Sequence, residues 1–117
     1  MEATDLAYIA GLFDGEGNVM CKTYKRRKRP SEKYYDTMYI RVEVAMTDEE
    51  AINYLQNTLN MGWSAPKRFN SRPNRRLQWR WCCGYRDALK FAKMIIPYAK
   101  TKKEKLQKII KHYETSL

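Results

Sequence analysis

The chain is 117 residues long and strongly basic, with 23 Lys and Arg residues against 13 Asp and Glu residues and a formal net charge of +10. This length suits one hydrophobic core but not two, so we expect a single domain over residues 1–117. Such an excess of positive charge favours a polyanionic partner, most commonly nucleic acid, over a merely soluble basic protein. A membrane surface is a weaker alternative, because no basic amphipathic helix stands alone.

The N-terminus and the cysteines predict an intracellular protein that does not enter a membrane. The first residues, Met-Glu-Ala-Thr-Asp, lack the blocks of a signal peptide, and no apolar run reaches the roughly 18 residues of a membrane span. Cys21, Cys82 and Cys83 have neither zinc-site nor disulfide-framework spacing, so we expect reduced thiols. The expected location is cytoplasm, an organelle, or a phage or prokaryotic host, without secretion. A single histidine, His112, argues against nucleases that use several.

A helix is the first predicted element, with Thr4 as its expected cap and Asp5 in its first turn. One stripe of apolar residues at helical spacing indicates the side that faces the core. That stripe consists of Leu6, Ile9, Ala10 and Phe13.

The opposite stripe of this helix is made of small residues four positions apart, Ala7, Gly11 and Gly15. No charged residue occurs between Leu6 and Phe13, so the helix is apolar on every side. Such a helix is normally covered on every side. In a chain this short the second cover is most simply a partner molecule, and small residues let two helices approach backbone to backbone.

Alternation with period two then predicts two strands, joined by a charged loop over residues 26–33. Each strand has one apolar and one polar face. The first alternates Val19, Cys21 and Thr23 with Met20, Lys22, Tyr24 and Arg26, and the second alternates Met38, Ile40, Val42 and Val44 with Thr37, Tyr39, Arg41 and Glu43.

The second half of the chain predicts a helix, two more strands and two further helices. Thr47 and Glu50 fit a capping box at the start of a helix that ends at Gly62. Strands are expected over residues 65–72 and 77–83. The apolar positions that mark the last two helices are Ala88, Phe91, Ala92 and Ile95, followed by Leu106, Ile109, Ile110 and Tyr113.

The predicted fold is therefore α+β, in the order αββαββα(α), with a four-stranded antiparallel sheet. Helices are expected on its apolar face, and a nucleic acid duplex on the other face, which is polar and cationic. Trp63, Trp79 and Trp81 are expected in the core, with stacking on bases as the less favoured alternative.

Residues 9–17 read Ile-Ala-Gly-Leu-Phe-Asp-Gly-Glu-Gly and resemble the LAGLIDADG signature of homing endonucleases, with five of nine letters identical and the rest conservative. The resemblance extends to the predicted order of elements and to residues 97–102, so it covers nearly the whole chain. The motif stands where a predicted helix gives way to a basic strand, which is the structural context that supports the match.

The resemblance implies a homodimeric, site-specific homing endonuclease encoded in a mobile intron or similar element. Its expected activity is a double-strand break in a long, pseudo-palindromic DNA target, dependent on Mg²⁺ or Mn²⁺. An alternative from another class is a non-cutting protein of the same fold, either an RNA maturase or a DNA-binding protein. Half of a hetero-pair is a further alternative. The implied dimer interface comprises Ala7, Ala10, Gly11, Asp14 and Gly15.

The motif also has a physical interpretation that does not depend on the name. Close approach of two such helices brings together two copies of Glu16, and carboxylates at helix C-termini form a good site for cations. Hard oxygen ligands suit Mg²⁺ or Mn²⁺. Gly15 and Gly17 are expected to adopt backbone angles that other residues avoid, turning the chain from helix to strand.

By resemblance, Glu16 is the metal-ligating acid, the Gly15 carbonyl is a second metal ligand, and Asp14 is structural. Lys102 matches a lysine that lies near the scissile phosphate in this family, where a positive group would offset charge or tune the attacking water. The alternatives are an exposed acid in a glycine-rich turn for Glu16 and a solvated lysine for Lys102.

Side chains at every second position of a ribbon can reach successive base edges in the major groove, whereas loop cations meet phosphates. The expected DNA-binding residues are Lys22, Tyr24, Arg26, Lys28, Arg41, Glu43, Arg68, Arg72, Gln78 and Arg80.

Overall fold

The structure is a computed structural model that describes residues 1–67 and 77–115. Its element order confirms the prediction from the sequence. The elements are α1 (Ala3–Glu16), β1 (Gly17–Arg26), β2 (Tyr35–Met46), α2 (Glu49–Leu59), β3 (Trp63–Lys67), β4 (Gln78–Gly84), α3 (Tyr85–Ile95) and α4 (Lys103–Thr115).

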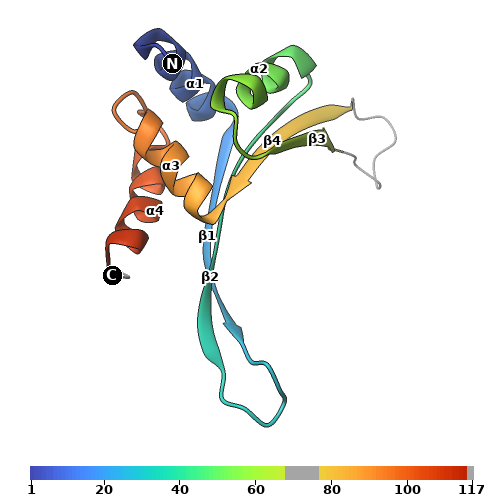
Figure 1. The fold of residues 1–117 in the computed structure, drawn as a ribbon, viewed down its shortest axis with the longest axis vertical. Helices are drawn as coiled ribbons and strands as arrows, with labels where there is room; N and C mark the ends of the chain where they lie inside the picture. The colour runs from blue at the N-terminus through green and yellow to red at the C-terminus, as the bar shows by residue number, and fades with distance from the viewer. Residues whose placement is uncertain (68–76, 116–117) are drawn as a thin grey trace.

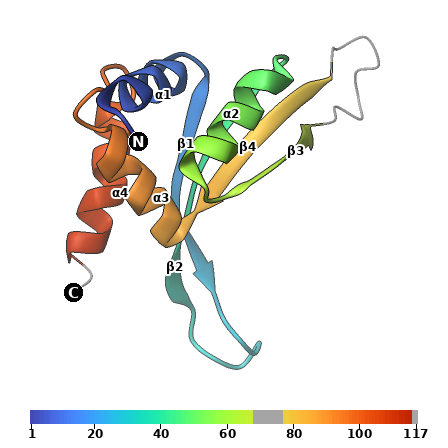
Figure 2. The same cartoon turned by 45° about the horizontal axis from the view of Figure 1, so that its top comes forward.

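The strands form one four-stranded antiparallel sheet in the order β1-β2-β4-β3. The helices gather around one end of this sheet, and the β1–β2 hairpin projects far beyond them (Figures 1 and 2). In both views α2 lies along β4, and the turn between α3 and α4 lies beside α1. The molecule is correspondingly elongated, with principal extents of 49 × 39 × 24 Å.

The register of the sheet confirms the alternation predicted for β1 and β2. Paired residues in neighbouring strands share a face, so the pair Cys21 and Ile40 lies on the helix-covered face, and the pair Lys22 and Tyr39 lies on the other. Trp81 pairs with Val44 and is fully buried. We call the face opposite the helices the polar face.

The core lies between the helices and the sheet. Ile9, Ala10 and Phe13 of α1 are fully buried, as their spacing predicts. The Phe13 ring packs against Phe91 of α3, which in turn packs against Trp81 of β4. This aromatic row joins α1, α3 and the sheet and sets where the C-terminal end of α1 lies.

Two predicted helix caps are wrong by one or two residues. Helix α1 has Glu2, not Thr4, as its N-cap, because the Asp5 carboxylate accepts a hydrogen bond from the Glu2 N–H at 3.1 Å. Asp48 rather than Thr47 caps α2 and accepts from the Glu50 N–H at 3.0 Å. Thr47 and Asp48 are adjacent and both of the N-capping type, so sequence alone does not decide between them, whereas Glu2 is not a residue type that usually caps a helix.

The described cysteines are free, and burial raises the pKa of the Cys83 thiol to about 12, so it stays protonated. In residues 1–67 and 77–115, no helix has the length and apolar character needed to cross a membrane.

Candidate active site and nucleic-acid interface

One face of α1 exposes its small residues. Ala7, Gly11 and Gly15 are exposed, and a Cβ built on either glycine would meet nothing of this chain within 4 Å. The space beside these glycines is therefore open to another molecule. Ala10, in contrast, is fully buried in the chain's own core, so its prediction as a dimer-interface residue is wrong. We call Ala7, Gly11 and Gly15 the glycine stripe.

The prediction of unusual backbone angles at the two glycines that end α1 is wrong. Gly15 continues the helix, and Gly17 is extended, with φ −83° and ψ 158°. Gly17 is required for space instead, because a Cβ there would collide with the ring and the carbonyl oxygen of Phe13. The chain can thus pass directly from helix into β1 over a buried aromatic ring.

Asp14 ties the end of α1 to the turn before α4. Its carboxylate accepts hydrogen bonds from the backbone N–H groups of Lys100 at 2.8 Å and Lys102 at 3.1 Å. Its carbonyl oxygen accepts from the Thr101 hydroxyl at 3.0 Å and from Lys102 Nζ at 3.1 Å. The structural role expected for Asp14 is consistent with these four bonds.

The same contacts bring Lys102 to the end of α1 that carries the candidate metal ligand. Glu16 is the last residue of α1 and is exposed, two positions beyond the carbonyl that holds the Lys102 ammonium. Carbonyl oxygens at a helix C-terminus carry partial negative charge, so both the ammonium and a metal cation are favoured there. The structure therefore places Glu16, Gly15 and Lys102 around one helix end.

A single copy of the chain supplies few metal ligands at this place. Within the described residues, no three or more His, Cys, Asp or Glu side chains come together in a way that could hold a metal ion. The Glu16 carboxylate and the Gly15 carbonyl are hard oxygen donors of the kind that Mg²⁺ prefers. The donor type fits a divalent cation, while the remaining ligands must come from water, substrate or a second chain.

The predicted DNA-binding residues of the strands share the polar face. Sheet pairing places Lys22, Tyr24 and Arg26 of β1 on the same side as Arg41 of β2 and Arg80 of β4. Gln78 pairs with Lys67 and lies on this face as well. Arg68 and Arg72 lie outside the described residues.

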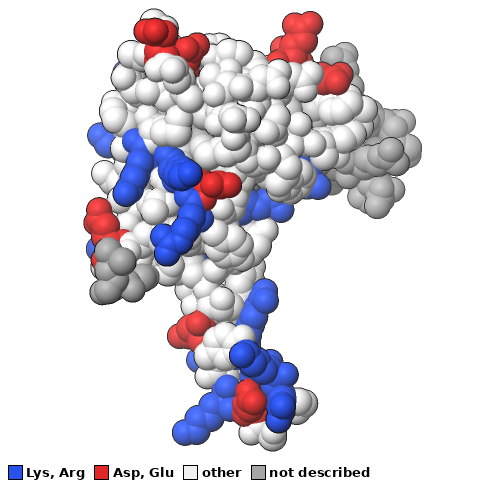
Figure 3. Space-filling model, in the orientation of Figure 1, with Lys and Arg blue, Asp and Glu red and all other residues white. Residues whose placement is uncertain are grey.

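One concentration of positive charge lies at the lower end of the projecting hairpin, where Lys and Arg side chains crowd together (Figure 3). Lys28 is exposed there. The Arg27 guanidinium is held by the Pro30 carbonyl at 2.7 Å and lies 4.5 Å from the centre of the Tyr34 ring. Tyr34 and Tyr35 expose 58% and 47% of their surface, so the tip offers both cations and stacking faces.

The middle of the polar face holds a buried acid that the sequence did not distinguish from its exposed neighbours. Glu43 is only 5% exposed, and its Oε1 lies 3.7 Å from Arg41 and 3.8 Å from Arg80. The prediction that Glu43 contacts DNA directly does not agree with this burial, because the carboxylate lies between two arginine head groups. The Tyr39 hydroxyl accepts from Arg41 and raises the pKa of this guanidinium further, so Arg41 remains charged.

Trp63 lies beside these arginines rather than in the core, so its predicted burial is wrong. It is 44% exposed, and the guanidinium carbons of Arg41 and Arg80 lie 5.1 and 4.9 Å from the centre of its ring. The reason is the register of β3, in which Trp63 pairs with Cys82 and therefore faces the polar side. Trp79 and Trp81 point to the core as predicted.

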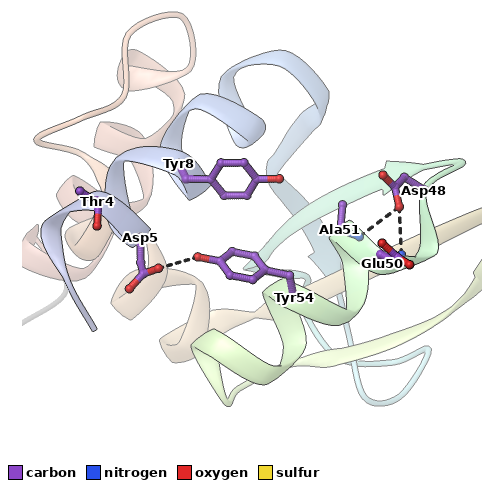
Figure 4. Close-up of a pocket in the computed structure, with 7 residues that line it drawn as sticks. All are labelled: Thr4, Asp5, Tyr8, Asp48, Glu50, Ala51 and Tyr54. Atoms are coloured by element: carbon purple, nitrogen blue, oxygen red, sulfur yellow. Dashed lines mark hydrogen bonds between the residues drawn. The ribbon is translucent and has the colours of Figure 1, made fainter.

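A groove between α1 and α2, about 440 Å³ in volume, was not anticipated from the sequence (Figure 4). The Tyr54 hydroxyl donates to Asp5 at 2.8 Å across it, and this bond lowers the pKa of Asp5 and raises that of Tyr54. The side chains around it carry negative charge, which does not suit a polyanion. The groove is lined by Thr4, Asp5, Tyr8, Asp48, Glu50, Ala51 and Tyr54.

Comparison with known proteins gives no match at the level of sequence, either to a family model or to a characterised protein. The fold, however, matches solved homing endonucleases. I-CvuI, in complex with its DNA target, superposes with a TM-score of 0.69 at 18% identity over 89% of this chain and 62% of that one. The archaeal intron-encoded I-Vdi141I, complexed with DNA, gives 0.69 at 14% identity over 93% and 66%. This chain has the LAGLIDADG homing endonuclease fold.

The fold that the resemblance in residues 9–17 implies is thereby confirmed. A third structure, the meganuclease I-SmaMI bound to uncleavable DNA, superposes at 0.68 with 14% identity over 94% of this chain. The chain spans only 36% of I-SmaMI and less than two thirds of I-CvuI. The LAGLIDADG fold described here thus corresponds to part of those longer chains.

Proposed function

We propose that the chain is one subunit of a homodimeric, site-specific DNA endonuclease that makes a double-strand break in a long, pseudo-palindromic target with Mg²⁺ or Mn²⁺. The observation that carries the proposal is the end of α1, where an exposed glycine stripe leads directly to Glu16 and where Lys102 is held 3.1 Å from the Asp14 carbonyl. I-CvuI and I-Vdi141I, which share this fold, are homing endonucleases, and I-Vdi141I and the meganuclease I-SmaMI were solved with DNA bound.

Pairing of two copies through the glycine stripe would bring two helix C-termini together. Small residues permit the closest helix approach, and each helix would contribute one Glu16 carboxylate and one Gly15 carbonyl to the site between them. Divalent metal bound there supplies a more acidic water and stabilises the leaving oxygen in phosphodiester hydrolysis.

Lys102 would hold its positive charge beside the scissile phosphate. The Asp14 carbonyl takes one of its three N–H groups, and the Asp14 carboxylate fixes the backbone on either side of Thr101. A cation restrained in this way stabilises negative charge that develops in the transition state without having to reorganise. Its proposed role is therefore electrostatic, with Asp14 and Thr101 as its supports.

The polar face and the basic hairpin would bind the duplex. Alternate residues of β1, β2 and β4 point to this face, as an antiparallel ribbon in the major groove requires. The hairpin cations, including Lys28, would contact phosphates farther from the cutting site.

A non-cutting RNA maturase or DNA-binding protein is the second candidate. It is favoured by the exposed Tyr34 and Tyr35 at the basic tip, because aromatic rings beside cations are typical of contacts to unpaired RNA bases. Splicing that survives substitution of Glu16 would support it.

The test uses a pool of supercoiled plasmids with randomised inserts, incubated with the purified protein and Mg²⁺. Linear products are recovered and sequenced, and an enriched, nearly palindromic site is expected. Glu16→Gln should lower the cutting rate at that site by about 100-fold or more, as expected for loss of a group that acts in the transition state, and should spare DNA binding. Glu114→Gln, at the distant end of α4, is the matched control. Normal cutting by Glu16→Gln would show that the assigned chemistry is wrong.

A further inference from the structure

The central acid on the polar face has surroundings that a solvent-exposed DNA contact would not need. The side chain of Glu43 is 7% exposed, against 21% for Arg41 and 32% for Arg80. Burying a carboxylate is costly unless charge partners surround it, and here two guanidinium groups do so. Glu43 is therefore built into the face beneath its neighbours.

Sheet register explains how one acid reaches both arginines. Glu43 pairs with Cys82, and Cys82 pairs with Trp63, so the three side chains form a row across β2, β4 and β3. Arg41 precedes Glu43 by two positions on β2, whereas Arg80 pairs with Ala45 on its other side. The two arginines thus lie on opposite sides of the row along the strand direction, and both contact Glu43 and Trp63.

Each of the two guanidinium groups contacts both the Glu43 carboxylate and the Trp63 ring. Glu43 lies at the edge of both groups, and the indole of Trp63 lies against the faces of both. Arg41 is further held by the Cys82 sulfur at 2.9 Å. Long side chains ordered in this way have already lost the rotational freedom that binding would otherwise remove.

We propose that Glu43 is a positioning residue which, together with Trp63, holds Arg41 and Arg80 as a fixed pair for reading guanine bases in the major groove. The inference rests on the proposed function, since it presumes a DNA duplex on the polar face. The O6 and N7 acceptors of guanine are the commonest specific target of an arginine side chain in the major groove.

A base edge suits this pair better than a phosphate does. The Glu43 carboxylate cancels one of the two positive charges and would repel a phosphate. Guanine is neutral, so the carboxylate weakens its binding to the arginines much less. Backbone anions have better partners on the hairpin tip, where Lys and Arg side chains crowd together (Figure 3).

The experiment compares binding selections from a randomised duplex library, with Ca²⁺ in place of Mg²⁺ so that cutting does not interfere. Selections with Arg41→Ala and Arg80→Ala first identify the base positions that these side chains read. Glu43→Gln should then reduce guanine preference at the same positions by roughly 10-fold. Its affinity for unrelated duplex should stay equal or rise, because the substitution adds one unit to the net charge of +10.

Two controls separate this role from charge and from folding. Glu114→Gln makes the same chemical change on α4 and should leave the selected motif unchanged. Trp63→Leu removes the stacking face and should relax the positions that Glu43→Gln relaxes, whereas Trp63→Phe should largely retain them. If Glu43→Gln fails to fold, the two Trp63 variants decide. Relaxed base preference in Trp63→Leu but not in Trp63→Phe supports the proposal, and the same base preference in both variants overturns it.

Other outcomes would also overturn the inference. If the Glu43→Gln variant selects the same DNA motif as the unaltered protein, Glu43 does not position the two arginines. Relaxation at positions that neither arginine variant affects would indicate that Glu43 itself touches a base. If the unaltered protein selects no sequence at all, the proposed function fails, and this inference fails with it.

Discussion

At the scale of single residues, Gly17 makes a sharp prediction about stability. A Cβ at this position would overlap the ring and carbonyl of Phe13, which is fully buried and packed against Phe91. Since neither the ring nor the backbone can easily move, Gly17→Ala should lower the free energy of unfolding by about 2–3 kcal/mol. Urea denaturation followed by tryptophan fluorescence would measure this change.

Gly11→Ala is the matched control, with the same substitution six positions earlier in the same segment. Its Cβ would meet nothing within 4 Å of the chain, and alanine favours helix over glycine by about 0.5–1 kcal/mol. We therefore expect this variant, measured where it is monomeric, to be as stable as the unaltered chain or slightly more so. Equal losses in both variants would contradict the packing described around Phe13.

At the scale of elements, the contact between α1 and the turn before α4 depends on one carboxylate. Asp14→Ala leaves the backbone N–H groups of Lys100 and Lys102 without their acceptor, which should cost about 1–3 kcal/mol. Hydrogen exchange provides a local measurement: these two amides should exchange much faster in the variant, while amides in the middle of β2 should not.

Asp36→Ala, on the distant hairpin strand, is the comparison for that experiment. It should leave the exchange of the Lys100 and Lys102 amides unaltered. If Asp14→Ala also leaves them protected, the turn is held by something other than the Asp14 carboxylate, and the support assigned to Lys102 is wrong.

The elements themselves were largely predictable from the sequence, for a physical reason. Alternation with period two in β1 and β2 and helical spacing in α3 and α4 reflect burial on one side, which acts on every residue of an element. The cap of α2 reflects a choice between two neighbours of similar chemistry, which explains the wrong prediction at Thr47, whereas the Glu2 cap of α1 depends on the hydrogen bond from the Glu2 N–H to Asp5. The side of the sheet on which Trp63 lies depends on strand register, which is set by residues far away in the sequence.

At the scale of the whole molecule, the candidate site was predictable only in part. Glu16 and Lys102 could be recognised through a motif and its relation to residues 97–102, and the structure brings both to one helix end. The burial of Ala10 and the arginine pair around Glu43 could not be recognised, because both depend on packing between separate elements. If a second copy completes the site, as we propose, one chain carries only half of the ligands.

The account depends most on pairing through the glycine stripe, and sedimentation analysis tests it directly. At micromolar concentration the unaltered chain should sediment as a dimer, with twice its mass of 14.0 kDa. Gly11→Leu should fold, since its side chain points into open space, yet sediment as a monomer because bulk there keeps two helices apart. A monomeric unaltered chain, or a Gly11→Leu variant that remains fully dimeric, would contradict the account.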